Sequence, residues 1–146
     1  MIITATITNL QEITKLALKL WPEHDFNELM REYQDIISNE NNVIFLKKKN
    51  DKLIGFAQCG LRFDYVEGTS SSPVAYLEGI YIEEEYRRCG YAKELVKACE
   101  EWAKSKNIKE FASDCEINNI DSYLFHLKLG FIEANRIICF TKKIGD

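Results

Sequence analysis

Residues 74–92 read VAYLEGIYIEEEYRRCGYA, which is the pattern of a strand, a turn and the start of a helix. An apolar strand at Val74–Ile82 is followed by a short acidic turn, and the segment Arg87–Ala92 then opens a helix. The first N–H groups of a helix have no partner inside it, and the helix dipole places partial positive charge there. Gly90 leaves the backbone accessible, and two arginines precede it. The stretch therefore predicts a site for a phosphorylated cofactor.

Composition restricts the class of protein. The chain has 146 residues, of which 46% are hydrophobic and 29% charged, so we expect one globular domain over residues 1–146. The net charge of −4 argues against a nucleic-acid partner and suits a cationic small substrate. The five cysteines form no CxxC pair and only two histidines are present, so we expect no metal, and reduced thiols in the cytoplasm. Neither a signal peptide nor a membrane partner is expected.

Hydrophobic periodicity predicts one mixed α/β domain. In the first half we expect a strand at 2–7, a helix at 10–20, a helix capped by Asp25, and strands at 42–48 and 52–61 around an Asn50-Asp51 hairpin. A polar loop at 64–73 leads into the central strand. After Gly90 we expect a helix, a short strand at 110–114, a helix at 120–129 closed by Gly130, and a last strand at 137–143, with a further short strand near 132–135.

Two motifs in this order resemble those of the GCN5-related N-acetyltransferases. Arg87-x-x-Gly90-x-Ala92 after an apolar strand is similar to the family's motif A, and Asn119, a helix and Gly130-Phe131 are similar to its second acetyl-CoA motif. The resemblance implies a mostly antiparallel central sheet, with splayed parallel strands 4 and 5 and about four flanking helices. It also implies that acetyl-CoA lies in the splay. The cofactor-binding residues would be Ile80, Tyr81, Ile82, Arg87, Arg88, Cys89, Gly90, Tyr91, Ala92 and Asn119.

Further blocks resemble the aminoglycoside 6′-N-acetyltransferases. They include Trp21-Pro22-x-His24, Asp64-Tyr65-Val66, Leu77-Glu78-Gly79-Ile80 and Ala112-Ser113-Asp114, spread over most of the chain. The resemblance implies direct attack of the 6′-amine of an aminoglycoside antibiotic on the thioester, and a homodimer. It implies that the substrate-binding residues are Trp21, His24, Tyr65, Glu78, Asp114 and Asn135, where relatives often carry an acid in place of Asn135.

Four residues are candidates for proton transfer. Glu78 and Asp114 are each candidates for the group that accepts the proton of the amine or for a carboxylate that binds the substrate cation. His126 stands where many family members have a tyrosine, and it is a candidate acid for the leaving thiolate; Tyr123, one turn earlier, is a weaker one. Two other functions remain open at this point: acetylation of another amine, such as a polyamine or a protein N-terminus, and non-catalytic acyl-CoA binding.

Overall fold

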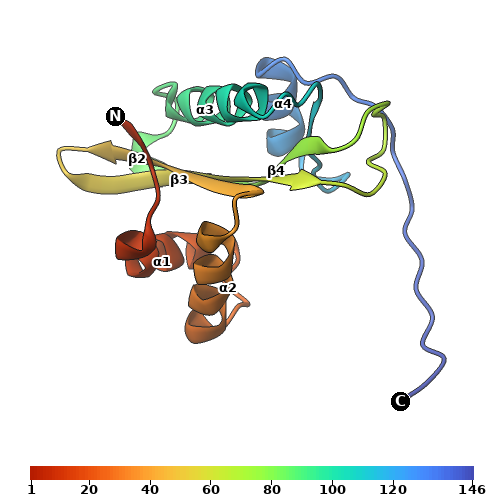
Figure 1. Ribbon diagram of the computed structural model, residues 1–146, viewed down its shortest axis with the longest axis horizontal. Coiled ribbons are helices and arrows are strands. Elements are labelled where there is room, and N and C mark those ends of the chain that lie inside the picture. Colours follow the sequence, from red (N-terminus) through yellow and green to blue (C-terminus); the bar gives the residue numbers. More distant parts are fainter. The chain divides into compact units, whose positions relative to one another are not determined.

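The protein is built around a five-stranded sheet with the strand order β1-β2-β3-β4-β5 (Figure 1). The computed structural model describes all of residues 1–146. Neighbouring strands from β1 to β4 are antiparallel, and β4 and β5 are parallel. The predicted mixed α/β fold is therefore confirmed. The elements are β1 (Ile2–Thr4), α1 (Leu10–Leu20), α2 (Phe26–Ser38), β2 (Asn42–Lys49), β3 (Lys52–Arg62), β4 (Val74–Ile82), α3 (Tyr91–Ser105), β5 (Phe111–Ala112) and α4 (Ile120–Lys128), with 3₁₀ turns at Ile7–Asn9 and Glu84–Tyr86.

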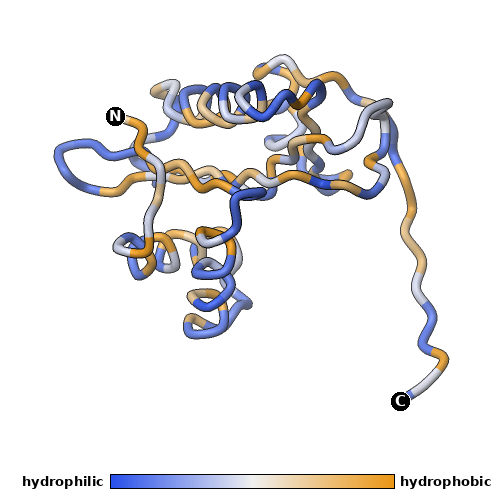
Figure 2. The backbone as a smooth tube through the Cα atoms, viewed as in Figure 1, coloured by the Kyte–Doolittle hydropathy of each residue, from blue (hydrophilic) through white to orange (hydrophobic).

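The chain divides into two compact units, Met1–Asp114 and Cys115–Asp146. In the first unit α1 and α2 cover one face of the sheet and α3 covers the other (Figure 1). The strands are largely apolar in Figure 2, whereas the turn that joins β2 to β3 is hydrophilic. Ile13 of α1, Leu46 of β2 and Phe56 of β3 are fully buried between the helices and the sheet. Burial of such side chains is the main favourable term in forming this layered core.

Local signals in the sequence fix several boundaries. The Asp25 carboxylate accepts a hydrogen bond from the Glu28 N–H at 3.1 Å and begins α2 as an N-cap, as predicted. Asn50 and Asp51 have φ values of 52° and 63°, which a two-residue type I′ hairpin requires. The predicted first strand is shorter than expected. It ends at Thr4 because the Thr6 N–H bonds the Asn9 side chain at 2.9 Å and turns the chain into a 3₁₀ helix.

A β-bulge interrupts the pairing of β3 with β4. Gln58 pairs with Gly79 and Cys59 pairs with Leu77, so Glu78 has no opposite residue on β3. A bulge of this kind bends the strand and re-aims the side chain of the extra residue. Gly79, next to the bulge, lets the Trp21 ring lie against β4, because a Cβ on Gly79 would come within 2.5 Å of that ring.

Parallel pairing between β4 and β5 is short. It joins Ala75 to Phe111 and Tyr76 to Ala112 only, because β5 has two residues instead of the predicted five. Beyond Tyr76, β4 continues to Ile82 without a β5 partner. The two strands therefore separate, as the splayed pair in the prediction requires.

The second unit contains α4 and the C-terminal segment. The Asn119 side chain caps α4 by accepting the Ser122 N–H at 3.1 Å, and Gly130 follows the helix with a φ of 95°, as predicted for a C-terminal glycine. The predicted strands at 132–135 and 137–143 are wrong for this chain, since no strand follows α4. Alternating apolar residues make a strand only where a partner backbone satisfies their N–H and C=O groups.

None of the helices has the length and apolar character that a membrane-spanning segment requires.

We predict that Gly79→Ala destabilises the fold by about 1–3 kcal/mol, because the new methyl group overlaps the Trp21 ring. Urea unfolding followed by circular dichroism measures this change. Gly145→Ala is the matched control, since a Cβ there meets no atom within 4 Å. Equal stability of the two variants would show that Trp21 does not rest on β4.

Candidate functional site

Two acidic side chains of the first unit belong to one polar cluster where β4 and β5 separate. Glu78, on the bulge, accepts hydrogen bonds from Arg62 Nε at 2.9 Å and from Arg62 Nη2 at 2.7 Å. This two-point arrangement fixes the plane of the carboxylate more firmly than a single contact does. The bond to Glu78 is the main reason that the pKa of Arg62 is raised. Arg62 therefore remains charged and holds Glu78 in one orientation.

Tyr76 connects this ion pair to the second carboxylate. The Arg62 guanidinium carbon lies 3.4 Å from the centre of the Tyr76 ring, and the Tyr76 hydroxyl donates a hydrogen bond to Asp114 Oδ2. Tyr76 is only 6% exposed, and burial is the first cause of its raised pKa, followed by the bond to Asp114. Glu78 and Asp114, which sequence reasoning singled out, are thus brought into one cluster by two residues that it missed. One sequence feature could have pointed to Tyr76. It lies two positions before Glu78, and residues at this spacing lie on the same side of a strand.

The segment before α3 forms an open turn. Arg87 Nε bonds the Ile82 carbonyl at 2.8 Å, so this arginine ties the turn to the end of β4. Arg88 and Gly90 both have positive φ values, 64° and 83°. A Cβ on Gly90 would meet no atom within 4 Å, and no side chain caps the first N–H groups of α3. An uncrowded helix start with a nearby arginine fits a phosphate or diphosphate group.

The edge of β4 beside this turn suits an extended ligand. Residues Leu77–Ile82 face no strand on the β5 side, whereas on their other side all except Glu78 pair with β3. The predicted cofactor residues Ile80, Tyr81 and Ile82 lie on this edge. An unpaired strand edge can accept an extended chain by main-chain hydrogen bonds. The open edge and the start of α3 are therefore two parts of one candidate ligand site.

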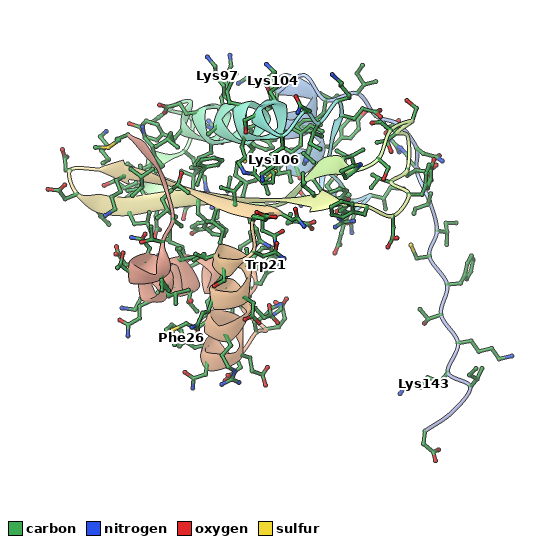
Figure 3. All side chains as sticks on the ribbon, viewed as in Figure 1. Trp21, Phe26, Lys97, Lys104, Lys106 and Lys143 are labelled. Carbon is green, nitrogen blue, oxygen red and sulfur yellow. The ribbon has the colours of Figure 1, made fainter.

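The predicted aromatic residues lie at different depths. Trp21 packs on the sheet on the side of α1 and α2, with its ring centre 6.5 Å from that of Phe56 (Figure 3). The His24 ring centre lies 6.3 Å from that of Trp21, and its imidazole is 3.6 Å from the Glu23 carboxylate. Tyr65 is 75% exposed on the loop before β4. The structure therefore brings Trp21 and His24 together, and it presents Tyr65 to solvent.

The remaining predicted residues lie in the second unit. Asn119 uses its side-chain oxygen as the cap of α4. His126 Nδ1 lies 2.7 Å from the Ser122 carbonyl, which only accepts hydrogen bonds, so Nδ1 carries a proton in this contact. Asn135 accepts the Arg136 N–H at 2.8 Å.

Comparisons with known proteins give consistent results. The family model described as "Acetyltransferase (GNAT) family" matches residues 10–131. An aminoglycoside N(6′)-acetyltransferase type 1 of Serratia marcescens is 38% identical over 146 residues, which cover 99% of this chain and 100% of that protein.

Solved structures agree with this match. The crystal structure of the aminoglycoside antibiotic 6′-N-acetyltransferase AAC(6′)-Ih from Acinetobacter baumannii has a TM-score of 0.93 and 36% identity, covering 99% of both chains. The structure of AAC(6′)-Iy in complex with the bisubstrate analog CoA-S-monomethyl-acetylneamine has a TM-score of 0.94 and 34% identity, covering 98% of this chain and 97% of that one.

We predict that Tyr76→Phe makes stability less sensitive to alkaline pH. The raised pKa of Tyr76 means that the folded state keeps the phenol proton after the unfolded state has lost it near pH 10. The wild-type protein therefore loses about 1.4 kcal/mol per pH unit through this group above pH ~10, and nothing through it below.

Urea unfolding at several pH values from about 8 to 11 measures the difference between the two proteins. Other groups that titrate in this range, such as Tyr33, remain in both proteins, so their contribution cancels. If the stability of wild type and of Tyr76→Phe changed in parallel with pH, the raised pKa of Tyr76 would be contradicted.

Proposed function

The chain belongs to the GNAT family of acetyltransferases, and we propose that it is an aminoglycoside 6′-N-acetyltransferase. It moves the acetyl group of acetyl-CoA to the 6′-amino group of an aminoglycoside and so removes one positive charge from the antibiotic, which confers resistance. The observation that carries the substrate assignment is the pair of carboxylates, Glu78 and Asp114, held in one cluster at the point where β4 and β5 separate. Residues 1–146 work as one acetyltransferase domain.

The donor half of the reaction uses the open turn and the open strand edge. Acetyl-CoA supplies an acetyl thioester, whose C–S bond breaks as the C–N bond to the amine forms, with CoA leaving as the thiol. The N–H groups at the start of α3, with Arg88 and the backbone at Cys89, Gly90 and Ala92, hold the diphosphate. The backbone of Ile80–Ile82 hydrogen-bonds the extended arm. Arg87 keeps the turn in position through its bond to the Ile82 carbonyl.

The acceptor half of the site recognises cations. Aminoglycoside amines are mostly protonated at neutral pH, like that of lysine, so carboxylates bind them and one must then lose a proton to react. Each carboxylate has about four lone-pair positions, so Glu78 and Asp114 retain capacity beyond Arg62 and Tyr76. One of them receives the proton of the amine directly or through water. His126 is the proposed proton donor to the leaving thiolate.

Aromatic and polar residues complete the proposed acceptor site. The resemblance to aminoglycoside acetyltransferases supports Trp21, His24, Tyr65 and Asn135 as contacts to the aminosugar rings. Flat aromatic faces suit sugar rings and attract nearby cations. Trp21 rests on Gly79, the residue next to Glu78, and so lies near the proposed ammonium site.

Neomycin and paromomycin test this function, since they share one ring system and differ in an amino or a hydroxyl group at the 6′ carbon. We expect turnover of neomycin, seen as CoA thiol release and a monoacetylated product by mass spectrometry, and paromomycin turnover at least about 100-fold lower in kcat/KM.

Other outcomes of this experiment are equally informative. Equal turnover of the two drugs would contradict 6′ specificity. Turnover of spermidine or a peptide amine without turnover of neomycin would make the chain an acetyltransferase of another amine. Binding of acetyl-CoA without thiol release for any amine would make it a non-catalytic module.

We predict that Gly90→Asp binds CoA about tenfold more weakly than Gly90→Asn, because the carboxylate repels the diphosphate. Both side chains have nearly the same shape and tolerate the positive φ of this position, so their difference isolates charge. Titration calorimetry with CoA measures both dissociation constants. Equal dissociation constants for the two variants would show that the diphosphate does not bind next to Gly90.

We propose that the protein is a cytoplasmic homodimer. Residues 131–146 carry exposed apolar side chains, with Ile138 at 81% and Phe140 at 87% exposure, which is the composition expected of a strand that pairs with a second copy.

Five free cysteines, of which Cys89, Cys115 and Cys139 are exposed, suit a reducing compartment such as the cytoplasm.

We predict that Phe140→Asp shifts the protein from dimer to monomer, because a charged side chain is expensive to bury in an apolar interface. Sedimentation velocity at several protein concentrations measures the assembly. Thr141→Asp is the control, since it introduces the same side chain at an exposed position that points to the opposite side of a strand from Phe140. A dimer of unchanged affinity in Phe140→Asp would exclude the C-terminal segment from the interface.

A further inference from the structure

Arg62 is a cation inside a site that we assign to a cationic substrate. It ends β3, opposite Val74 at the start of β4, and its guanidinium reaches Glu78 with two hydrogen bonds of 2.7 and 2.9 Å. Both hydrogen bonds go to the Glu78 carboxylate, which is the group that we propose for binding a substrate ammonium. The arginine therefore bears directly on how that carboxylate meets a substrate.

The position of Arg62 also affects the second carboxylate. Its guanidinium stacks on Tyr76, whose hydroxyl bonds Asp114, so one positive charge lies within the cluster of both acids. Two carboxylates and one guanidinium give the cluster a net charge of about −1, since the phenol is neutral below its raised pKa. Arg62 thus halves the charge that attracts a polycation.

The ion pair of Arg62 and Glu78 is accessible to solutes. The side chains of Arg62 and Glu78 are 42% and 28% exposed, so the ion pair is at the surface of the cluster and is not sealed in the core. Ion pairs with such exposure contribute little net stability, because water compensates for much of their attraction. A substrate ammonium can therefore compete with the guanidinium for Glu78.

We propose that Arg62 determines the charge selectivity of the acceptor site, as a resident counterion that competes with the substrate ammonium for Glu78. This inference rests on the proposed function, and it goes beyond that function by assigning a specificity-determining role to Arg62. Its removal leaves a site that binds aminoglycosides more tightly, and the gain grows with the number of ammonium groups on the drug.

The test compares kanamycin A with kanamycin B, which differ in a hydroxyl or an amino group at the 2′ carbon. We expect Arg62→Met to lower KM for both drugs, and to lower it about threefold more for kanamycin B. Raising the ionic strength from about 0.05 to about 0.5 M should remove most of this extra gain, because salt screens exposed charges. A purely structural role would not produce this salt dependence.

Two further variants serve as controls. Arg62→Lys keeps the positive charge but cannot make the two-point contact with the Glu78 carboxylate. It should therefore keep the wild-type ratio of the two KM values, whatever its effect on kcat. Lys97→Met removes one positive charge from the outer side of α3, where Lys97 points away from the sheet (Figure 3), and should leave the ratio unchanged. Arg62→Gln replaces Arg62→Met if thermal unfolding shows that the latter does not fold.

Several results would overturn the proposal. A rise of KM in Arg62→Met, or an equal change for both drugs, would mean that Arg62 positions Glu78 and does not compete for it. Loss of the wild-type KM ratio in Arg62→Lys would have the same meaning. Failure of the wild-type chain to acetylate both kanamycins and neomycin is a separate result, since it would reject the proposed function itself.

Discussion

The separation of β4 from β5 after Tyr76 is the constraint on which the site depends. Two residue pairs hold the strands together, and the bulge at Glu78 lies two residues after the second pair on β4. Because β5 ends at Ala112, the edge of β4 up to Ile82 stays available for a ligand backbone. The same separation leaves Asp114 beyond the end of β5, within reach of the Tyr76 hydroxyl. One interruption of strand pairing thus accounts for both the strand edge that we propose for the donor and the two carboxylates that we propose for the acceptor.

The surrounding structure stabilises this interruption. Trp21 packs against Gly79 beside the bulge, and Arg87 fixes the following turn to the last residue of β4. The bulge and the turn therefore each have a side-chain contact that holds their backbone in place. A site built on such fixed elements needs little reorganisation when it binds its ligands, which favours both affinity and catalysis.

The sequence predicted most elements because their signals are local. Asp25, the Asn50-Asp51 pair and Gly130 each act on the backbone next to them, and the structure places all three as expected. The C-terminal strand failed for the opposite reason: a strand depends on a partner, and the pattern of 137–143 carries no information on where that partner is. The carboxylates Glu78 and Asp114 were found through a family resemblance. Arg62 and Tyr76 were missed, because their roles arise from strand register and stacking, which a bulge alters and a linear sequence does not reveal.

We propose that the open edge of β4 takes up the extended arm of acetyl-CoA by backbone hydrogen bonds. Amide hydrogen exchange, measured residue by residue with and without CoA, tests it most directly. We expect amides within Leu77–Ile82 that face away from β3 to become protected on binding, together with those at the start of α3, while exposed amides of the β2–β3 turn do not change. Protection confined to the start of α3, with no change along β4, would show that the arm does not bind to this edge.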